Sequence, residues 1–427
     1  MASCTTENWT LADLASALLS MHKDKKKIAV PMFQRGKRWK NSQQQVFIDS
    51  LIKGFPVGTM LFYEEIIQDG SQVYILVDGL QRGNCIKKYM NNPTEFFYDS
   101  SISDEFCESV LTVINKNDPE NYSIIRDVLT SFIKEQKTFK NLQYYYPSQR
   151  IIEEFDVSPS LVGELIGVIG KFFEERQSLY EQISMTVIPI VVYHGDSNDL
   201  PEIFDRINSQ GTPLDQYEVY AASWPVNKRF HVSNIKIVES AIKKYDSFVE
   251  DGFQIYGYDR EKMRASKEVN AFEYLFGLSK YLIHTYDILG FDKKLEDDTV
   301  SSLGFELVNA CLNDNKEKIA TLYESVYSLS NVDQFEQALY EAIKFVNDSV
   351  SPIFRFKGNC RPPKNGEPTQ PRFRIYHSKF QILSMISTTF KEMYRNGDYS
   401  KISDEWKEKK DHIAHNLRHY YVYDIPN

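Results

Sequence analysis

Hydrophobic residues near the start of the chain recur at helical spacing. Thr10 is a suitable N-cap for a helix, because its hydroxyl can accept a hydrogen bond from an amide of the first turn. The apolar positions that follow it are Leu11, Leu14, Ala15, Leu18 and Leu19. The pattern predicts that the chain opens with a helix, which a charged linker at 23–27 follows.

An extended segment and a second helix are predicted next. Pro31 biases the residue before it away from helical geometry, so 28–33 is predicted to be extended. A helix is then predicted to begin at Ser42 and to end at Gly54. Its expected buried face consists of Val46, Phe47, Leu51 and Ile52.

Two short runs rich in β-branched and aromatic residues, 59–63 and 73–77, flank a polar turn and predict a β-hairpin. The second run stops at Asp78 and Gly79, and helical spacing follows from 80 to 90, with Cys85, Ile86 and Tyr89 as candidates for the buried face. The segment 78–82 is therefore predicted to lie where a strand turns into a helix.

The remaining pattern is mainly helical. Strand character returns only at 183–193, and a short helix at 200–208 precedes Gly211, with another helix expected near Thr212. The predicted fold class is α+β, followed by an all-helical region. The predicted domains are 1–225, with a helical insertion at 92–182, and 226–427.

Composition supports a globular protein with two or three domains. The chain has 427 residues, 42% of them hydrophobic, and a formal charge of −9. This composition does not suit a disordered or collagen-like chain, and an acidic balance argues against sequence-blind nucleic-acid binding.

Cysteine usage and hydropathy indicate the cellular compartment in which the protein is expected. The five cysteines include no Cys-x-x-Cys pair, which favours free thiols in a reducing environment. Apolar runs are far shorter than the roughly 20 residues that span a bilayer, and the first residues lack a signal-peptide core. We expect a soluble, cytoplasmic protein without a membrane partner.

Although the net charge of the chain is negative, two of its segments are positively charged. Residues 21–40 carry a net +7 and residues 355–380 a net +6. Local charge of this kind attracts polyanions, although most basic runs are solvated loops, and both interpretations stay open. The candidate DNA-binding residues are Lys37, Arg38 and Trp39 in the first segment and Arg372 and Arg374 in the second.

The strand-to-helix junction at Asp78–Arg82 is the strongest local candidate for chemistry. Free amides at a helix N-terminus favour an anion, and Gly79 allows a phosphate to approach the backbone. Arg82 is suited to clamp that phosphate, and Asp78 to hold Mg²⁺ or a ribose hydroxyl. An ordinary Asp-Gly turn is the alternative.

Four ordered motifs resemble one known family. They are Val30-Pro-Met-Phe-Gln-Arg35 with Trp39, Phe47-Ile-Asp-Ser-Leu-Ile-Lys-Gly-Phe-Pro-Val57, Val77-Asp-Gly-Leu-Gln-Arg82, and Ile203-Phe-Asp-Arg-Ile-Asn-Ser-Gln-Gly-Thr-Pro-Leu214. Together they resemble the ParB-like domain of phage-defence and modification-dependent restriction proteins of the GmrSD and SspE type. The resemblance covers about the first 220 residues.

The resemblance implies a ParB/sulfiredoxin-like core that binds a nucleoside triphosphate, often hydrolyses it, and couples this to DNA sensing. The family's Asp-Gly-Gln-Gln-Arg signature falls on 78–82, and its Pro-x-x-Gln-Arg element on Pro31, Gln34 and Arg35. Two departures, Leu80 in place of Gln and Gly83-Asn84 in place of Leu-Thr, make binding better supported than hydrolysis.

The element around Arg206 and Asn208 has two interpretations. The family places it beside the signature loop, where both residues would complete a nucleotide pocket. Asn before Gly is also a common helix cap, so a purely structural role is the alternative.

Family members often end in a His-Asn-His nuclease, and the C-terminal region here lacks a good match. His412, His415 and His419 lie within eight residues on one predicted helix, whereas a ββα nuclease distributes its histidines over a hairpin and a helix. The three histidines share a helical face, so a metal site and a surface helix are both considered.

The predicted function is a nucleotide-binding, NTP-hydrolysing component of a bacterial anti-phage defence or restriction system that senses DNA. Asp78, Gln81 and Arg82 are the predicted catalytic residues, with Asp78 holding Mg²⁺. The predicted nucleotide-binding residues are Gln34, Arg35, Gly79, Arg206 and Asn208. The alternative is a non-catalytic DNA-binding or adaptor module that recruits a separate nuclease subunit, and a homo-oligomer is a further expectation. Cleavage of DNA by the core itself is the third hypothesis.

Overall fold

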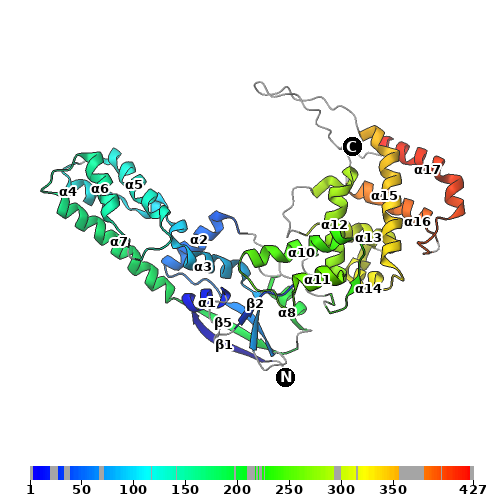
Figure 1. Cartoon of the computed structure of the whole chain (residues 1–427), viewed down its shortest axis with the longest axis horizontal. Coiled ribbons are helices and arrows are strands. Elements are labelled where there is room, and N and C mark those ends of the chain that lie inside the picture. Colours follow the sequence, from blue (N-terminus) through cyan, green and yellow to red (C-terminus); the bar gives the residue numbers. More distant parts are fainter. Residues whose placement is uncertain are drawn as a thin grey trace. The chain divides into compact units, whose positions relative to one another are not determined.

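The fold is described from a computed structural model of the chain (Figure 1). The described residues are 3–19, 27–32, 39–66, 72–116, 118–140, 142–196, 199–208, 217, 220, 224–225, 227–292, 300–313, 316–354, 379–395 and 397–423.

The chain divides into two compact units. Unit 1 comprises Met1–Pro31, Lys37–Ile207 and Gly252–Tyr256, and unit 2 comprises Met32–Gly36, Asn208–Asp251 and Gly257–Asn427. The first unit is α+β and the second is helical, so the predicted fold class is confirmed. The predicted domain limits at 225 and 226 stay predictions, because packing units need not be independently folding domains.

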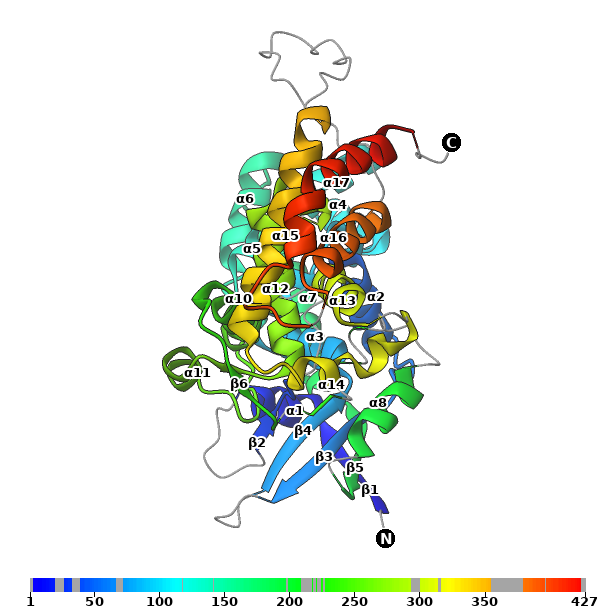
Figure 2. The same cartoon turned by 90° about the vertical axis from the view of Figure 1, so that its right-hand side faces the viewer.

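Unit 1 contains a five-stranded mixed sheet with the order β1-β5-β3-β4-β2, and Figure 2 shows these strands side by side. The strands are β1 (Ser3–Thr10), β2 (Lys27–Ala29), β3 (Met60–Ile66), β4 (Gln72–Asp78) and β5 (Val187–His194). Antiparallel pairing joins β3 to β4 and β1 to β5, whereas β3 with β5 and β2 with β4 are parallel. The predicted hairpin is therefore confirmed.

The first strand is a feature that the sequence did not predict. β1 is an edge strand whose side chains are mostly exposed, so it lacks the alternating hydrophobic pattern of a half-buried strand. The helix expected after it is present as α1 (Leu11–Leu18). The Thr10 hydroxyl caps that helix and accepts a hydrogen bond from the Asp13 amide at 3.0 Å.

The second helix, α2 (Asn41–Ile52), begins one residue earlier than predicted, and its buried face is partly different. Phe47, Ile48 and Leu51 are buried, but Val46 is 66% exposed and Ile52 is 41% exposed. The expectation for Val46 and Ile52 was wrong, because the face turned to the core is centred on Ile48.

The third helix agrees with its prediction. α3 (Leu80–Asn91) begins directly after β4, and it buries Cys85, Ile86 and Tyr89 as the spacing indicated. The junction between this strand and this helix is the predicted signature loop.

The segment between α3 and β5 is a helical insertion, as predicted, and it has its own hydrophobic core. Its elements are η1 (Pro93–Phe96), η2 (Asp99–Ser101), α4 (Asp104–Val113), η3 (Pro119–Asn121), α5 (Tyr122–Glu135), α6 (Tyr145–Phe155) and α7 (Val162–Ser184). Helices α4 to α6 lie alongside the long α7 (Figure 1). Because α7 continues to Ser184, the strand predicted at 183–193 begins four residues later.

Beyond β5, the short helix expected at 200–208 is present as α8 (Leu200–Asn208). The further helix expected near Thr212 lies outside the described residues.

Unit 2 is built around α12 (Ala271–Thr285), most of whose residues are buried. The other helices are α10 (Ile235–Glu250), α11 (Arg260–Ser266), η5 (Asp287–Asp292), α13 (Leu303–Leu312), η6 (Lys316–Thr321), α14 (Leu322–Tyr327), α15 (Val332–Phe354), α16 (Lys379–Met393) and α17 (Asp404–Tyr423). A short antiparallel pair, β6 (Phe230–His231) with β7 (Glu268–Val269), adds strand structure to a unit predicted as all-helical.

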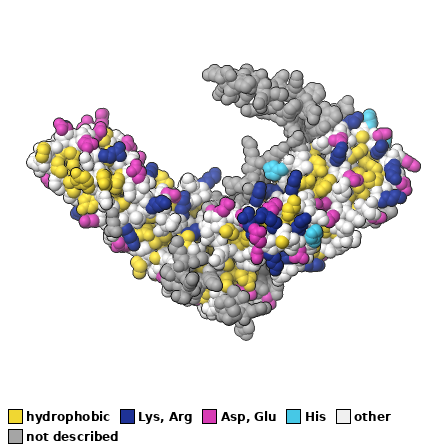
Figure 3. Space-filling view, in the orientation of Figure 1, with side chains coloured by type: hydrophobic (Ala, Val, Ile, Leu, Met, Phe, Trp, Pro, Cys, Tyr) yellow, Lys and Arg dark blue, Asp and Glu magenta, His cyan; other side chains and the backbone are white. Residues whose placement is uncertain are grey.

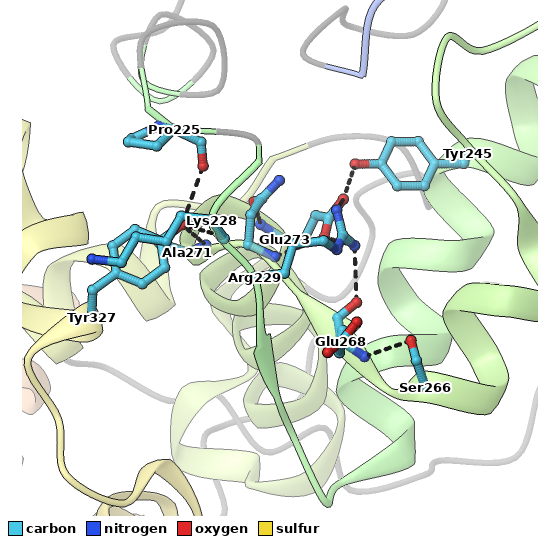
Figure 4. Close-up of polar contacts among 10 residues, drawn as sticks. Pro225, Lys228, Arg229, Tyr245, Ser266, Glu268, Ala271, Glu273 and Tyr327 are labelled. Atoms are coloured by element: carbon cyan, nitrogen blue, oxygen red, sulfur yellow. Dashed lines mark hydrogen bonds and ion pairs between the residues drawn. The ribbon is translucent and has the colours of Figure 1, made fainter.

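A buried carboxylate stabilises the N-terminus of α12 (Figure 4). Glu273, whose side chain is 1% exposed, lies 2.7 Å from the Arg229 guanidinium. It also accepts hydrogen bonds from the Tyr245 hydroxyl at 2.7 Å and from the Asn270 amide at 2.9 Å. These donors compensate the burial of its charge.

Among the described residues, no helix is both long and apolar enough to cross a membrane.

Candidate functional site

The signature loop is set by a left-handed glycine between β4 and α3. Gly79 has φ +105°, and a Cβ atom there would lie 2.9 Å from Cγ of Met60. Both facts favour glycine at this position. Gly79 is the N-cap of α3 and provides no side-chain hydrogen bond, so the first-turn amides keep the anion-binding potential expected of a helix N-terminus.

Asp78 and Arg82 form an ion pair across this loop. Nη2 of Arg82 donates to Oδ2 of Asp78 at 2.6 Å, and the two side chains are 20% and 29% exposed, respectively. Nη1 of Arg82 donates to the Val57 carbonyl at 3.4 Å. A Cβ atom on Gly58 would lie 2.6 Å from that nitrogen, so the glycine makes room for the guanidinium. The structure thus brings together a cation, a carboxylate and a helix N-terminus.

Gln81 connects the loop to Trp39. Its Oε1 atom accepts a hydrogen bond from the Trp39 amide at 3.3 Å, and Nε2 of Gln44 donates to the Trp39 carbonyl at 3.1 Å. The Trp39 ring packs against Phe47 with ring centroids 5.3 Å apart. The ring of this candidate DNA-binding residue is therefore partly engaged within unit 1.

The departures from the family signature lie on the packed face of α3. Leu80, Gly83 and Asn84 are buried, whereas Asp78, Gln81 and Arg82 are partly exposed. A Cβ atom on Gly83 would lie 3.2 Å from Met60 and 3.3 Å from Leu18. The substitutions therefore alter packing behind the loop and leave its three exposed polar residues in place.

Arg206 lies on α8 and pairs with Glu202 of the same helix at 2.5 Å. Asn208 is the last residue of α8, and its side chain is outside the described part of the structure. The predicted participation of both residues in a nucleotide pocket stays a prediction.

The remaining predicted site residues lie outside the described ranges. They are Gln34, Arg35, Lys37, Arg38, Arg372 and Arg374. On the face of the described surface shown in Figure 3, basic and acidic side chains are intermixed. Several of the described basic side chains are held in ion pairs, such as Arg264 with Glu239 and Arg260 with Asp246.

The histidines predicted to share a helical face lie on α17. No cluster of three or more His, Cys, Asp or Glu side chains suited to a metal ion occurs in the described part of the chain. His412, His415 and His419 accordingly do not form such a cluster.

A contact at the other end of α3 was not predicted. The buried Lys87 ammonium lies 3.5 Å from the ring centroid of Phe253. The same downstream segment closes the edge of the sheet, because the Val30 amide donates to the Gln254 carbonyl at 2.7 Å and the Tyr256 amide to the Val30 carbonyl at 3.0 Å. No local sequence signal connects these two parts of the chain.

A surface pocket of about 250 Å³ lies between α2 and the start of the insertion. Its lining residues are Asn41, Gln44, Lys88, Glu95, Phe96 and Tyr98. Lys88 and Glu95 pair across it at 2.9 Å. Gln44 is thus shared between this pocket and the contact with Trp39.

Comparison with known protein families assigns the region that holds this loop. Residues 16–224 match the family model of the GmrSD restriction endonuclease, N-terminal domain. Comparisons with curated proteins and with solved structures gave no match. The matched range contains all four motifs, the helical insertion and the strands β2 to β5. Residues 16–224 are therefore similar to the N-terminal domain of GmrSD restriction endonucleases.

Proposed function

We propose that the loop Asp78–Arg82 binds the phosphates of a nucleoside triphosphate with Mg²⁺. The matched domain indicates a protein of a restriction or phage-defence system. Within that system, this chain would be the component that couples nucleotide binding, and hydrolysis where it occurs, to DNA sensing.

The observation that carries the proposal is the pairing of Arg82 with Asp78 at the start of α3. An arginine held at a helix N-terminus combines a fixed positive charge with the partial positive charge of the helix dipole. Gly58 makes room for the guanidinium, and Gly79 gives the loop its left-handed turn. This arrangement suits a phosphate group better than it suits a neutral ligand.

The donor set fits Mg²⁺ bound jointly with phosphates. Mg²⁺ in nucleotide sites commonly uses one or two carboxylates together with phosphate oxygens and water. Asp78 would hold the ion through the carboxylate that here accepts from Arg82. Arg82 would contact the phosphates, and the metal would supply further neutralisation of their charge.

DNA sensing is proposed to involve Lys37, Arg38 and Trp39, with Arg372 and Arg374 as a second set. Support comes from the charge of the two sequence segments and from the link between Trp39 and the signature loop. The adaptor that recruits a separate nuclease is the competing proposal. It predicts salt-dependent DNA binding that is unaffected by nucleotide.

Titration of the purified full chain with ATP, GTP, CTP and UTP in the presence of Mg²⁺ tests the nucleotide site. Arg82→Ala is expected to weaken binding of the preferred nucleotide about 10- to 100-fold, because it removes a charge-assisted contact to phosphate. Arg126→Ala is the matched control, since Arg126 pairs with Asp104 in the helical insertion. Equal affinity of wild type and Arg82→Ala, or no binding of any nucleotide, would overturn the assignment.

A further inference from the structure

Trp39 is held through its backbone by two glutamines from different helices. Gln81 of α3 accepts a hydrogen bond from its amide, and Gln44 of α2 donates one to its carbonyl. The residue thus forms a bridge between the first turn of α3 and the first half of α2. The Trp39 ring packs against Phe47, which adds a second contact to α2.

The position of Gln81 gives it a role other than direct chemistry. A glutamine that orients an attacking water uses its side-chain carbonyl as the acceptor for that water. Here that carbonyl oxygen accepts from the Trp39 amide at 3.3 Å. The geometry therefore directs this group toward the backbone of another segment.

We propose that Gln81 is a positioning residue that transmits the state of the Asp78–Arg82 loop to Trp39 and, through Gln44, to α2. The positioning part stands on the ligand-free geometry alone. The transmission part rests on the proposed nucleotide function.

Arg82 provides the physical connection to nucleotide state. In the proposed complex, its guanidinium turns toward phosphate and away from Oδ2 of Asp78, to which it donates at 2.6 Å in this structure. Gln81 is adjacent to Arg82 in the first turn of α3, so reorientation of this turn shifts both side chains. The Gln81–Trp39 bond, at 3.3 Å, is at the long end of the hydrogen-bond range and is easily lengthened or shortened.

The first experiment measures hydrogen–deuterium exchange at the Trp39 amide in the full, nucleotide-free chain. Gln81→Ala is expected to accelerate this exchange about fivefold, the factor that corresponds to a net hydrogen bond of about 1 kcal/mol. Gln81→Glu keeps an acceptor oxygen and should restore the wild-type rate. Gln43→Ala is the matched control, since Gln43 accepts from the Lys40 amide and not from Trp39.

The second experiment adds Mg²⁺ and each of ATP, GTP, CTP and UTP. In wild type, saturation with the nucleotide that binds should change the Trp39 exchange rate by about the same factor. When Gln81→Ala is saturated with that nucleotide, at the concentration its own titration requires, its Trp39 exchange rate should no longer respond. Gln81→Glu should recover the response.

The two experiments separate failure of this inference from failure of the proposed function. Equal Trp39 exchange in wild type and Gln81→Ala would overturn the positioning role, whatever the nucleotide result. Absence of nucleotide binding in wild type would overturn the proposed function and the transmission together, while the positioning role would still be decided by the first experiment. Nucleotide binding without any Trp39 response in wild type would overturn the transmission alone.

Discussion

The ammonium group of Lys87 lies 3.5 Å from the ring centroid of Phe253 in the interior of unit 1. Both residues are buried, so the lysine exchanges part of its hydration for the aromatic face. Phe253 thereby links the helix that begins at the signature loop to the segment that closes the β2 edge of the sheet.

Phe253→Ala is expected to destabilise the protein by about 3 kcal/mol, because it opens a cavity and leaves a buried cation without its ring. Phe253→Leu should cost less, since it retains apolar volume and loses only the cation–π contribution. The measurement is the urea unfolding midpoint of the full chain. Phe55→Ala serves as the control because Phe55 is 58% exposed. Similar effects of the alanine change at 55 and at 253 would contradict the account.

Gly79→Ala is expected to destabilise the protein by about 1–3 kcal/mol. The cost arises from the left-handed backbone at φ +105° and from the approach of the new Cβ to Met60. Gly167→Ala is a control for which the expected change in stability has the opposite sign. Gly167 lies within α7, and an added Cβ would have nothing within 4 Å of it. That change should stabilise the protein by about 0.5–1 kcal/mol. Thermal unfolding of both variants tests the pair, and a stabilising Gly79→Ala would contradict the strained geometry.

The hydrophobic pattern of the sequence predicted those elements whose buried residues all come from one short segment of the chain. The capped helix after Thr10, the β3–β4 hairpin and the buried face of α3 are of this kind. β1 was missed because an exposed edge strand obtains its hydrogen bonds from β5 and needs no hydrophobic alternation. Val46 was predicted to be buried but is exposed, since an apolar side chain in a helix can remain at the surface.

The position of the candidate loop was predictable from the sequence, but its tertiary contacts were not. The sequence placed Asp78, Gln81 and Arg82 at a strand-to-helix junction, as the structure has them. The contacts of Gln81 with Trp39 and of Lys87 with Phe253 join segments whose spacing along the chain carries no signal. Tertiary pairing of this type requires knowledge of the fold.

Glu273→Ala is expected to destabilise unit 2 by about 3–5 kcal/mol, because it leaves the Arg229 guanidinium without its buried partner (Figure 4). Double replacement of Glu273 and Arg229 should cost less than the sum of the two single changes. The control is the exposed pair on α8, where Glu202→Ala should change stability by at most about 1 kcal/mol. Chemical denaturation of the single and double variants measures the coupling. A Glu273 effect no larger than that of Glu202 would refute it.

Glu336 on α15 should make the stability of unit 2 depend on pH. Burial raises the pKa of its carboxyl to about 7, although a hydrogen bond from the Tyr340 hydroxyl, at 2.8 Å, acts in the opposite direction. Because this folded-state pKa lies above the ordinary value of 4.5, the native state holds the proton more strongly than the unfolded chain. The stabilising contribution is therefore complete below pH 4.5 and is lost as the pH rises through about 7.

The unfolding free energy should fall over that range by at most about 1.4 kcal/mol per pH unit from this group. Glu336→Gln has no proton to lose and retains an acceptor for Tyr340, so its stability should depend less on pH. Urea unfolding midpoints of wild type and variant are compared at pH 5, 6, 7 and 8. The stability of the variant relative to that of wild type should increase as the pH rises. Parallel curves would show that Glu336 is ionised in the folded protein throughout this range, in which case the Tyr340 hydrogen bond outweighs the effect of burial.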